Sequence, residues 1–444
     1  MCVNRNMNNI NILFLLIFFL FPLSLISQNE SATTKKSTFL DTLTYQTQSG
    51  LPVAASKIYF SDSKFTVSGF GEASYIHYNG AKDRASGDIE LYMTNLYRLV
   101  GYLGWKPQPW LVLYAEIFAE FLQDRDIEFH PEYFFEFFAD FLIHERFNVR
   151  IGTHQVQIGY LNNNDEPILY YSVNRPDVER IIIPSTWIDL GIMTYGKLAG
   201  DFKYSLSAYQ GLDTRNLNGG TWLRRGRDDE LRFNFNGWIL NSQLIYDGIK
   251  NTEMSLSGLL TRAGNNTSIP SAGIDKVVGK TWLLSSYLRH EYNRLTIMAL
   301  GSIGGMGDTD QIFQLTSLNN DQTGQVLGSQ VYGYYLEVGL DVLPWLRKKG
   351  NTSERNGFLI RKDEMKLPVF FRYERLNTHA GVHPGLMDEF RSQTDLKAWT
   401  LGVNFNPRKS MVIKANYQFR NNTQPLSNGE MEGNRMEMGV GFIF

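Results

Sequence analysis

Apolar and polar side chains alternate at every second position through much of this chain, and this pattern constrains its fold more than any other feature. In 331–342, 398–405 and 411–420, large apolar residues occupy one set of alternate positions, and glycine or polar residues occupy the other. Successive side chains of a β-strand point to opposite faces, so such segments form strands with one apolar and one polar face. The sequence therefore predicts β-structure between an apolar phase and water.

The alternating segments come in pairs that are connected unequally. Short turns such as 106–109 and 290–293 join the members of a pair, whereas longer polar stretches such as 212–230 and 302–330 separate one pair from the next. Short connections at one end and long connections at the other are typical of a transmembrane β-barrel. The length of 444 residues, which would indicate several domains in a soluble protein, then fits a single barrel over 58–444.

We predict an all-β fold, a transmembrane antiparallel β-barrel of sixteen strands, because closed bacterial barrels have an even number of strands. The connection 343–366 is too long for the short turn expected there, so fourteen to eighteen strands remain open. The predicted strands are 65–78, 94–105, 110–121, 133–143, 148–158, 189–198, 201–211, 231–246, 252–261, 281–289, 294–301, 331–342, 367–375, 398–405, 411–420 and 435–444.

The N-terminal residues predict export. In 1–27 a positive charge at Arg5 precedes an apolar run, and Ser24 and Ser27 are small residues near a cleavage site, as in a secretory signal peptide. An N-terminal membrane anchor is the alternative. The polar segment 28–57 has little periodicity, so we expect a flexible lead-in to the barrel.

Charge and motif content argue against a nucleic-acid-binding protein and against an enzyme. Lys and Arg total 43 against 45 Asp and Glu, so the chain lacks the basic excess of a nucleic-acid binder. There is no G-x-S-x-G motif, and the His-Glu pairs at 144–145 and 290–291 lack the second histidine of a zinc helix. The single cysteine, Cys2, lies in the signal segment. We predict no catalytic residue, no cofactor and no bound metal.

The last predicted strand alternates up to the C-terminus and ends with Phe442 and Phe444. A terminal amphipathic strand that ends in phenylalanine resembles the signal by which outer-membrane barrels are recognised for insertion. We therefore expect the barrel-assembly machinery and outer-membrane lipid as partners.

Charged residues on the polar faces of neighbouring strands are expected to line the lumen. The predicted strands 110–121 and 133–143 place four carboxylates inward, and arginines in the adjacent rows are their candidate partners. One interpretation is a charged ladder that tunes which ions pass, and the other is a set of salt bridges that braces the wall. These residues are Arg98, Glu116, Glu120, Glu136, Asp140 and Arg150.

The long connection 159–188 is expected to be the third outer loop and to fold into the lumen. Arginines and carboxylates together in such a loop can create a transverse field at a constriction, or can anchor the loop to the wall through ion pairs. The candidate constriction residues are Arg175, Glu179, Arg180, Trp187 and Asp189.

The run 175–180 followed by 184–191 resembles the family of phosphate-selective porins O and P, in which Glu-Arg, an apolar spacer and Asp-x-Gly lead into a strand. The segment 196–206 is similar to the next hairpin of that pattern. The resemblance implies an outer-membrane pore, often trimeric, for small anions such as phosphate or for nutrients. It carries over to Glu179, Arg180, Asp189 and Gly191, whereas Ile188 stands where many relatives have arginine.

We therefore predict an outer-membrane porin that lets small hydrophilic solutes or ions diffuse through a lumen narrowed by 159–188, with a homotrimer implied by the resemblance. The alternative is a non-conducting barrel whose outer loops, including Trp222–Arg227, bind a surface partner or glycan. The permeating solute and the sign of ion selectivity stay open.

Overall fold

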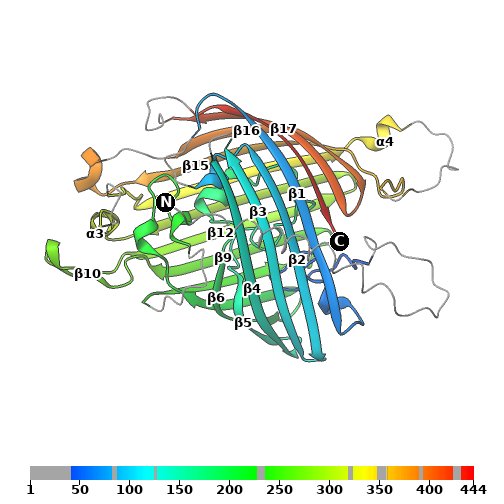
Figure 1. Ribbon diagram of the computed structural model, residues 1–444, viewed down its shortest axis with the longest axis horizontal. Coiled ribbons are helices and arrows are strands. Elements are labelled where there is room, and N and C mark those ends of the chain that lie inside the picture. Colours follow the sequence, from blue (N-terminus) through cyan, green and yellow to red (C-terminus); the bar gives the residue numbers. More distant parts are fainter. Residues whose placement is uncertain are drawn as a thin grey trace, which may run out of the picture. The chain divides into compact units, whose positions relative to one another are not determined.

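The computed structural model describes residues 42–82, 88–124, 128–227, 236–318, 324–347, 357, 359–389, 394–423 and 432–444. The predicted signal peptide, 1–27, lies outside these residues. Within them, sixteen strands form one closed antiparallel barrel (Figure 1), which confirms the predicted fold class. The barrel strands are β1 (Phe65–Asn79), β2 (Asn95–Gln108), β3 (Leu111–Asp124), β4 (Glu128–His144), β5 (Phe147–Gln155), β6 (Ile188–Lys197), β7 (Phe202–Gln210), β8 (Trp238–Tyr246), β9 (Thr252–Arg262), β12 (Lys280–Tyr292), β13 (Leu295–Met306), β14 (Gln330–Asp341), β15 (Pro368–Gly381), β16 (Asp395–Arg408), β17 (Met411–Asn422) and β18 (Asn434–Ile443).

The barrel closes where its first and last strands pair. β1 pairs with β2 on one side and with β18 on the other, with Phe70 opposite Ile443. The main chains of Gly69 and Phe444 exchange two hydrogen bonds of 3.0 and 2.9 Å. The C-terminal residue therefore takes part in closing the barrel.

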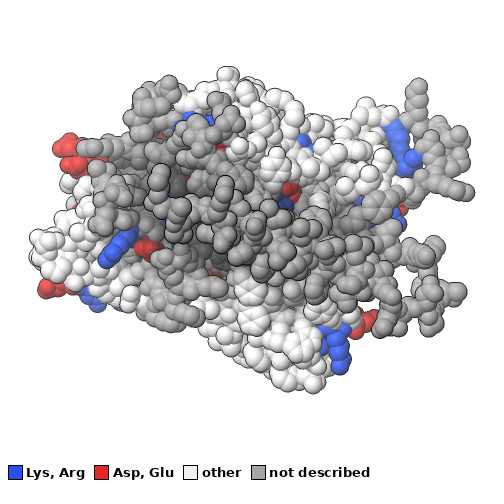
Figure 2. Space-filling model, in the orientation of Figure 1, with Lys and Arg blue, Asp and Glu red and all other residues white. Residues whose placement is uncertain are grey.

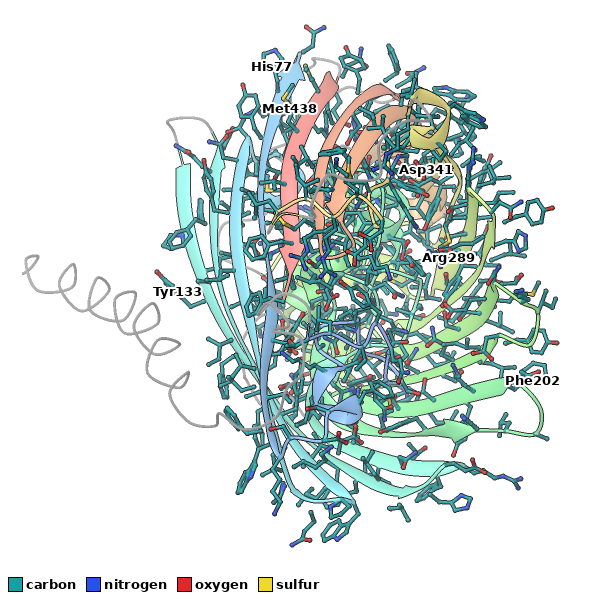
Figure 3. The ribbon with its side chains drawn as sticks, turned by 90° about the vertical axis from the view of Figure 1, so that its right-hand side faces the viewer. His77, Tyr133, Phe202, Arg289, Asp341 and Met438 are labelled. Atoms are coloured by element: carbon teal, nitrogen blue, oxygen red, sulfur yellow. The ribbon has the colours of Figure 1, made fainter. Side chains whose placement is uncertain are left out.

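Alternation separates the two faces of the wall. In β9, Leu256 and Leu260 are exposed on the outside, whereas Ser255 and Ser257 are buried on the inside. Figure 3 shows Tyr133 and Phe202 on the outer side of the wall. On the face shown in Figure 2, most of the visible charged side chains lie toward the two ends of the barrel. An apolar band between charged ends is the outer surface of a membrane barrel.

The two ends of the barrel differ, as α3 and β10 at one end and α4 and the C-terminus at the other show (Figure 1). We call them the long-loop end and the short-turn end. The connection 342–367 at the short-turn end contains α4, and β14 pairs directly with β15, so the open strand count resolves to sixteen. The long connections hold a β10–β11 hairpin and α3 where the sequence predicted only polar loops.

The elements outside the barrel wall are short. None of the helices among the described residues is long and apolar enough to span a membrane. The other elements are α2 (Lys57–Phe60), α3 (Thr309–Thr316), α4 (Leu343–Leu346), β10 (Thr267–Ile269), β11 (Ile274–Val277), η3 (Ile89–Leu91), η4 (Val178–Ile182), η5 (Thr214–Asn216), η6 (Arg224–Gly226), η7 (Pro270–Ala272) and η8 (Pro384–Glu389).

The described part of the expected lead-in, 42–57, differs from the flexible segment that we predicted. Leu51 and Ala54 are buried in one cluster with the inward-facing wall residues Val100 and Tyr114. The main-chain N–H of Ala54 donates to Glu166 at 2.6 Å. The prediction failed because both contacts join parts of the chain that are far apart in sequence, and local periodicity does not report such contacts.

Candidate functional site

The connection between β5 and β6, residues 156–187, is held inside the barrel by two different kinds of contact. We call it the inner loop. Its apolar residues pack against one part of the wall, and its polar backbone and acidic residues bond to another part. A loop with irregular backbone at this depth needs such partners, since buried N–H and C=O groups without them are costly.

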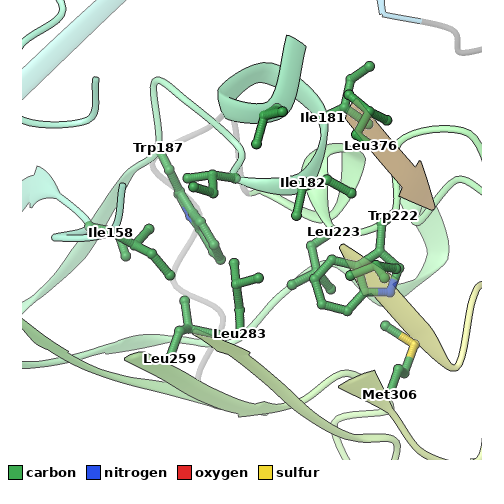
Figure 4. Close-up of a cluster of buried hydrophobic side chains, with 14 of the residues drawn as sticks. Ile158, Ile181, Ile182, Trp187, Trp222, Leu223, Leu259, Leu283, Met306 and Leu376 are labelled. Atoms are coloured by element: carbon green, nitrogen blue, oxygen red, sulfur yellow. The ribbon is translucent and has the colours of Figure 1, made fainter. Parts of the chain in front are cut away.

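The apolar contacts centre on Trp187, which is 0% exposed. Its ring lies among Ile158 of the inner loop and Leu259 and Leu283 of the wall (Figure 4). The connection 211–237 adds to the same cluster through Trp222, Leu223 and Leu217. This apolar cluster fills part of the lumen and excludes water from it.

The segment Trp222–Arg227, which the alternative prediction placed in an outer loop that binds a partner, is largely buried: Trp222, Leu223 and Arg224 are 0%, 0% and 1% exposed. Arg224 bonds Asp88 at 2.6 Å and the main-chain oxygen of Ser185 at 2.9 Å. The prediction that these residues face a surface partner is wrong, because they fold inward and fasten the inner loop.

The polar contacts centre on Asp177. Its carboxylate pairs with Arg420 and lies 3.8 Å from Arg435, and it accepts a hydrogen bond from Gln418 at 3.2 Å. Burial alone would raise the pKa of Asp177, but Arg420 and Arg435 hold it well below its usual value. Asp177 is therefore a buried anion that ties the inner loop to β17 and β18.

Glu179 stabilises the inner loop from within. Its Oε2 accepts the main-chain N–H groups of Tyr160 and Leu161 at 2.8 and 2.7 Å, and its Oε1 accepts the hydroxyl of Tyr335 at 2.7 Å. Burial raises its pKa, although these three donors oppose the shift. Glu179 thus satisfies backbone donors and has no free oxygen to offer a solute.

The two arginines of the inner loop differ in their surroundings. Arg180 pairs with Asp177 at 3.5 Å and donates to the main-chain oxygen of Glu90. Arg175 donates to Thr186 at 2.6 Å and keeps only a 3.9 Å contact with Asp165. Both arginines line cavities between the loop and the wall. Of the candidate constriction residues, Glu179 and Trp187 are buried supports and Asp189 is a buried residue of β6.

Asp140 and Arg150 form a fully buried ion pair on β4 and β5, with 2.9 Å between Arg150 Nη2 and Asp140 Oδ2. The hydroxyls of Tyr59 and Tyr195 also donate to Asp140, at 2.7 and 2.8 Å. This pair braces the wall and the segment before β1, which is the structural one of the two interpretations considered for it.

The remaining acids of the wall divide into a paired and an unpaired row. Arg98 pairs with Glu120 and with Glu72, the latter at 2.7 Å. Glu116 and Glu136 lie opposite each other on β3 and β4, and among the described residues neither forms an ion pair. Glu116 and Glu136 are 4% and 1% exposed. The salt-bridge interpretation therefore accounts for Glu120 but not for this opposed pair.

Two polar cavities lie at opposite ends of the lumen. The long-loop vestibule has a volume of about 560 Å³ and is lined by Glu90, Arg98, Glu116, Asp165, Arg175 and Arg225 among others. The short-turn vestibule has a volume of about 530 Å³ and is lined by Tyr45, Tyr170, Arg289, Arg294, Glu337 and Lys409 among others. Each is within the range of solute-binding pockets.

A small third cavity, which we call the throat, shares lining residues with both vestibules. Its volume is about 30 Å³. It shares Glu90, Arg98 and Arg175 with the long-loop vestibule, and Tyr170 with the short-turn vestibule. Lys414 Nζ lies 3.8 Å from the centre of the Tyr170 ring and so fixes that side chain at the throat. The three cavities form one candidate path along the polar side of the inner loop.

Sequence reasoning missed several residues of this site. Arg372, Lys414, Arg420 and Arg435 face inward on β15, β17 and β18, where they contact Ser172 and Asp177 of the inner loop. The same alternation that placed the acids of β3 and β4 also places these bases inward. Tyr170 carries no such signal, because its position depends on how the loop folds. Among the described residues, no group of three or more His, Cys, Asp or Glu is placed to hold a metal ion.

Comparisons with known proteins give one relative and several likenesses of fold. No protein-family model matches the chain. A protein of Aquifex aeolicus (strain VF5), described only as uncharacterized, is 27% identical over 380 residues, which cover 84% of this chain and 79% of the relative. Membership of the phosphate-selective porins O and P is not shown by these comparisons.

Three solved structures with a similar fold have low sequence identity to this chain. OmpF of Salmonella typhi, solved in complex with daunomycin, has a TM-score of 0.49 and 8% identity over 86% of this chain and 97% of that chain. DcaP of Acinetobacter baumannii has a TM-score of 0.47 and 12% identity, over 86% and 97%. The anion-selective porin of Comamonas acidovorans has a TM-score of 0.41 and 12% identity, over 86% and 99%. The description of this chain as a porin-like, closed sixteen-stranded barrel rests on its own strand pairing.

Proposed function

We propose that this protein is an outer-membrane diffusion channel for small hydrophilic solutes or ions. The observation that carries the proposal is that three cavities adjoin along the lumen: the throat shares Glu90, Arg98 and Arg175 with the long-loop vestibule and Tyr170 with the short-turn vestibule. Polar and charged side chains line this route, as they do in water-filled barrels. A closed antiparallel barrel with an apolar outer face supports placement in an outer membrane.

The throat limits what passes. A volume of about 30 Å³ exceeds the roughly 10–15 Å³ that one water molecule needs, so the throat holds few water molecules at a time. The route is therefore narrow, and we expect a small conductance carried by ions, with larger solutes admitted only when the inner loop shifts.

Charge in the long-loop vestibule favours cations over anions, although the throat has three arginines, Arg98, Arg175 and Arg180, against Glu72 and Glu90. Six carboxylates line the long-loop vestibule, namely Asp88, Glu90, Glu116, Glu120, Glu132 and Asp165. Four arginines face them, namely Arg98, Arg175, Arg225 and Arg227. Acidic linings raise the local concentration of cations. Passage of phosphate, which the resemblance implied, has less support than passage of small cations.

Reversal potential in a salt gradient tests this proposal. Refolded protein in a planar bilayer between unequal KCl solutions should pass current, with a reversal potential of the sign set by K⁺. A reversal potential set by Cl⁻ would favour an anion channel. A protein that folds into a barrel and passes no current would refute the channel.

A second candidate is a non-conducting barrel whose exposed loops bind a partner. The apolar cluster around Trp187 and Trp222 favours it, because that cluster closes part of the lumen to water. Such a partner would meet loops other than the buried Trp222–Arg224 segment. Absence of current from a folded barrel is the result that this candidate predicts.

We also propose a homotrimer, as the resemblance implied. A groove of about 680 Å³ on the outer wall supports it, lined by Ile192, Leu206 and Leu240 together with the small residues Thr194, Ala208 and Gly258. Small residues let the wall of a neighbouring barrel approach closely. Sedimentation of the refolded protein in detergent tests this, and a monomer at micromolar concentration would contradict it.

A further inference from the structure

Several buried polar atoms without a hydrogen-bond partner gather beside the long-loop vestibule. They are Tyr114 Oη, Glu116 Oε2, both carboxylate oxygens of Glu136, Asp165 Oδ1 and Glu166 Oε2. Glu116 and Glu136 are cross-strand neighbours, and Glu116 interacts electrostatically with Asp165 and Glu166 of the inner loop. The atoms therefore belong to one cluster, in which every carboxylate has an unused acceptor.

Such a cluster is costly without a compensating cation. A buried acceptor that makes no hydrogen bond loses about 1–3 kcal/mol, and neighbouring carboxylates repel one another as well. The nearby arginines bond mainly to other groups, since Arg98 pairs with Glu72 and Glu120, and Arg175 donates to Thr186 and lies 3.9 Å from Asp165 Oδ2. The cluster thus brings together four carboxyl groups, those of Glu116, Glu136, Asp165 and Glu166, and the one cation among the described residues that contacts them is Arg175, at 3.9 Å from Asp165.

The cluster is open to solutes on one side. Glu116 and Asp165 both line the long-loop vestibule, whose volume of about 560 Å³ accommodates a small organic molecule. The rings of Phe70 and Phe118 line the same vestibule. Carboxylates and aromatic rings together are the surroundings that favour an organic cation.

The geometry favours an ammonium group over a metal ion. Metal ions such as Ca²⁺ need several oxygens that converge at about 2.3–2.6 Å. No group of three or more acidic or histidine side chains among the described residues is placed to do this. A primary ammonium group has three N–H donors that reach acceptors at ordinary hydrogen-bond distances, so Glu116 and Asp165 suit it without converging on a point.

We propose that the long-loop vestibule binds solutes through a primary ammonium group, which donates hydrogen bonds to Glu116 and Asp165. The inference rests on the proposed function, because the same vestibule is the entrance to the proposed route, and it adds the chemical class of solute. Small amines and the amino termini of short peptides belong to this class.

Binding to the refolded barrel in detergent micelles tests this inference without requiring current. The probes are L-alanyl-L-alanine amide, which carries one ammonium group, and its N-acetyl derivative, which carries none. Saturation-transfer NMR at low ionic strength should show binding of the amide, with the acetylated form at least tenfold weaker. Equal binding of the two probes, or binding of neither, would overturn the inference.

Matched variants locate the site. Glu116→Gln and Asp165→Asn keep the side-chain shape and should each weaken binding of the amide about tenfold, since each removes a charge-assisted hydrogen bond. Glu253→Gln is the control, because Glu253 bonds Tyr287 and does not line the vestibule. Equal weakening by the control would contradict the site. If a vestibule variant fails to fold, the comparison of the two probes on the unaltered protein still tests whether the ammonium group is needed for binding.

The outcomes separate this inference from the proposed function. If the barrel binds the amine selectively but passes no current, the proposed binding site stands and the proposed channel is refuted. If the barrel passes current but binds the two probes equally, the proposed channel stands and the proposed binding site is refuted.

Discussion

Glu116 on β3 and Glu136 on β4 lie directly opposite each other, and both carboxylates face the lumen without an ion pair among the described residues. Further along the same strand, Glu120 pairs with Arg98. This part of the wall therefore has two rows of inward acids: an unpaired row, Glu116 and Glu136, and a neutralised row, in which Glu120 pairs with Arg98. The neutralised row braces the barrel, and the unpaired row gives the long-loop vestibule its negative field.

Replacing one acid of the unpaired row should stabilise the barrel. Glu136→Gln removes a like-charge cross-strand contact, so we expect the free energy of unfolding to rise by about 0.5–1 kcal/mol. Glu120→Gln is the opposite case, because it leaves Arg98 with one partner fewer and should lower that free energy by about 3 kcal/mol. Urea unfolding in micelles measures both, and effects of the same sign would contradict this account of the wall.

Removing the charge of Asp177 should loosen the inner loop. Asp177→Asn leaves Arg420 and Arg435 buried with one counter-charge fewer, so we expect a loss of about 3–5 kcal/mol in the free energy of unfolding. Asp247→Asn is the control, because its pair with Lys203 is exposed, with 37% and 40% side-chain exposure, and is worth about 1 kcal/mol or less. A loss for Asp177→Asn no larger than that of the control would show that Asp177 does not anchor the loop.

The free energy of unfolding should fall as pH rises, because Glu166 has a raised pKa in the folded protein. Burial, and then the charge of Asp165, raise the pKa of Glu166 to about 8 from the usual 4.5. Between these two values the unfolded chain has lost the proton that the folded state keeps, so the contribution of Glu166 is fully present below pH 4.5 and is lost as pH rises to about 8.

The variant Glu166→Gln removes this dependence while keeping an acceptor for the main chain of Ala54. The difference in free energy of unfolding between variant and unaltered protein should therefore grow with pH, by at most about 1.4 kcal/mol for each pH unit, and level off above pH 8. Unfolding measured in micelles from pH 4 to 9 checks this. A difference that stays constant with pH would contradict the raised pKa.

The apolar cluster should carry much of the stability of the inner loop. Trp222→Ala leaves a cavity among Leu223, Met306 and their neighbours, so we expect a loss of about 3–5 kcal/mol. Trp399→Ala is the control, because Trp399 is 48% exposed on the outer wall, and it should lose much less. Similar losses from the two variants would show that the cluster is not tightly packed.

The strands were predictable because lipid and water impose alternation residue by residue. The predicted strand 411–420 became Met411–Asn422, and the predicted 65–78 became Phe65–Asn79. Where an inward face is apolar, alternation weakens, as at Leu259–Leu260 and Leu283–Leu284, where both faces carry leucine. That doubling was a readable sign that something apolar fills the lumen there.

The site itself was predictable only in part. Inward acids such as Glu116 follow from strand register, but their partners depend on which strands and loops meet across the lumen. The contacts of Asp177 with Arg420 and of Glu166 with Ala54 join distant parts of the chain. Single-sequence patterns carry no information on such pairings, so the roles of Glu179 and Trp187 as buried supports came from the structure alone.

The most direct test of the central claim is the single-channel conductance of matched variants in planar bilayers. If the route passes the throat beside Tyr170, then Tyr170→Ala should at least double the conductance, while the lipid-facing Tyr334→Ala and the cluster variant Trp222→Ala leave it unchanged. An unchanged conductance in Tyr170→Ala together with an increase in Trp222→Ala would place the route on the other side of the inner loop and contradict the account.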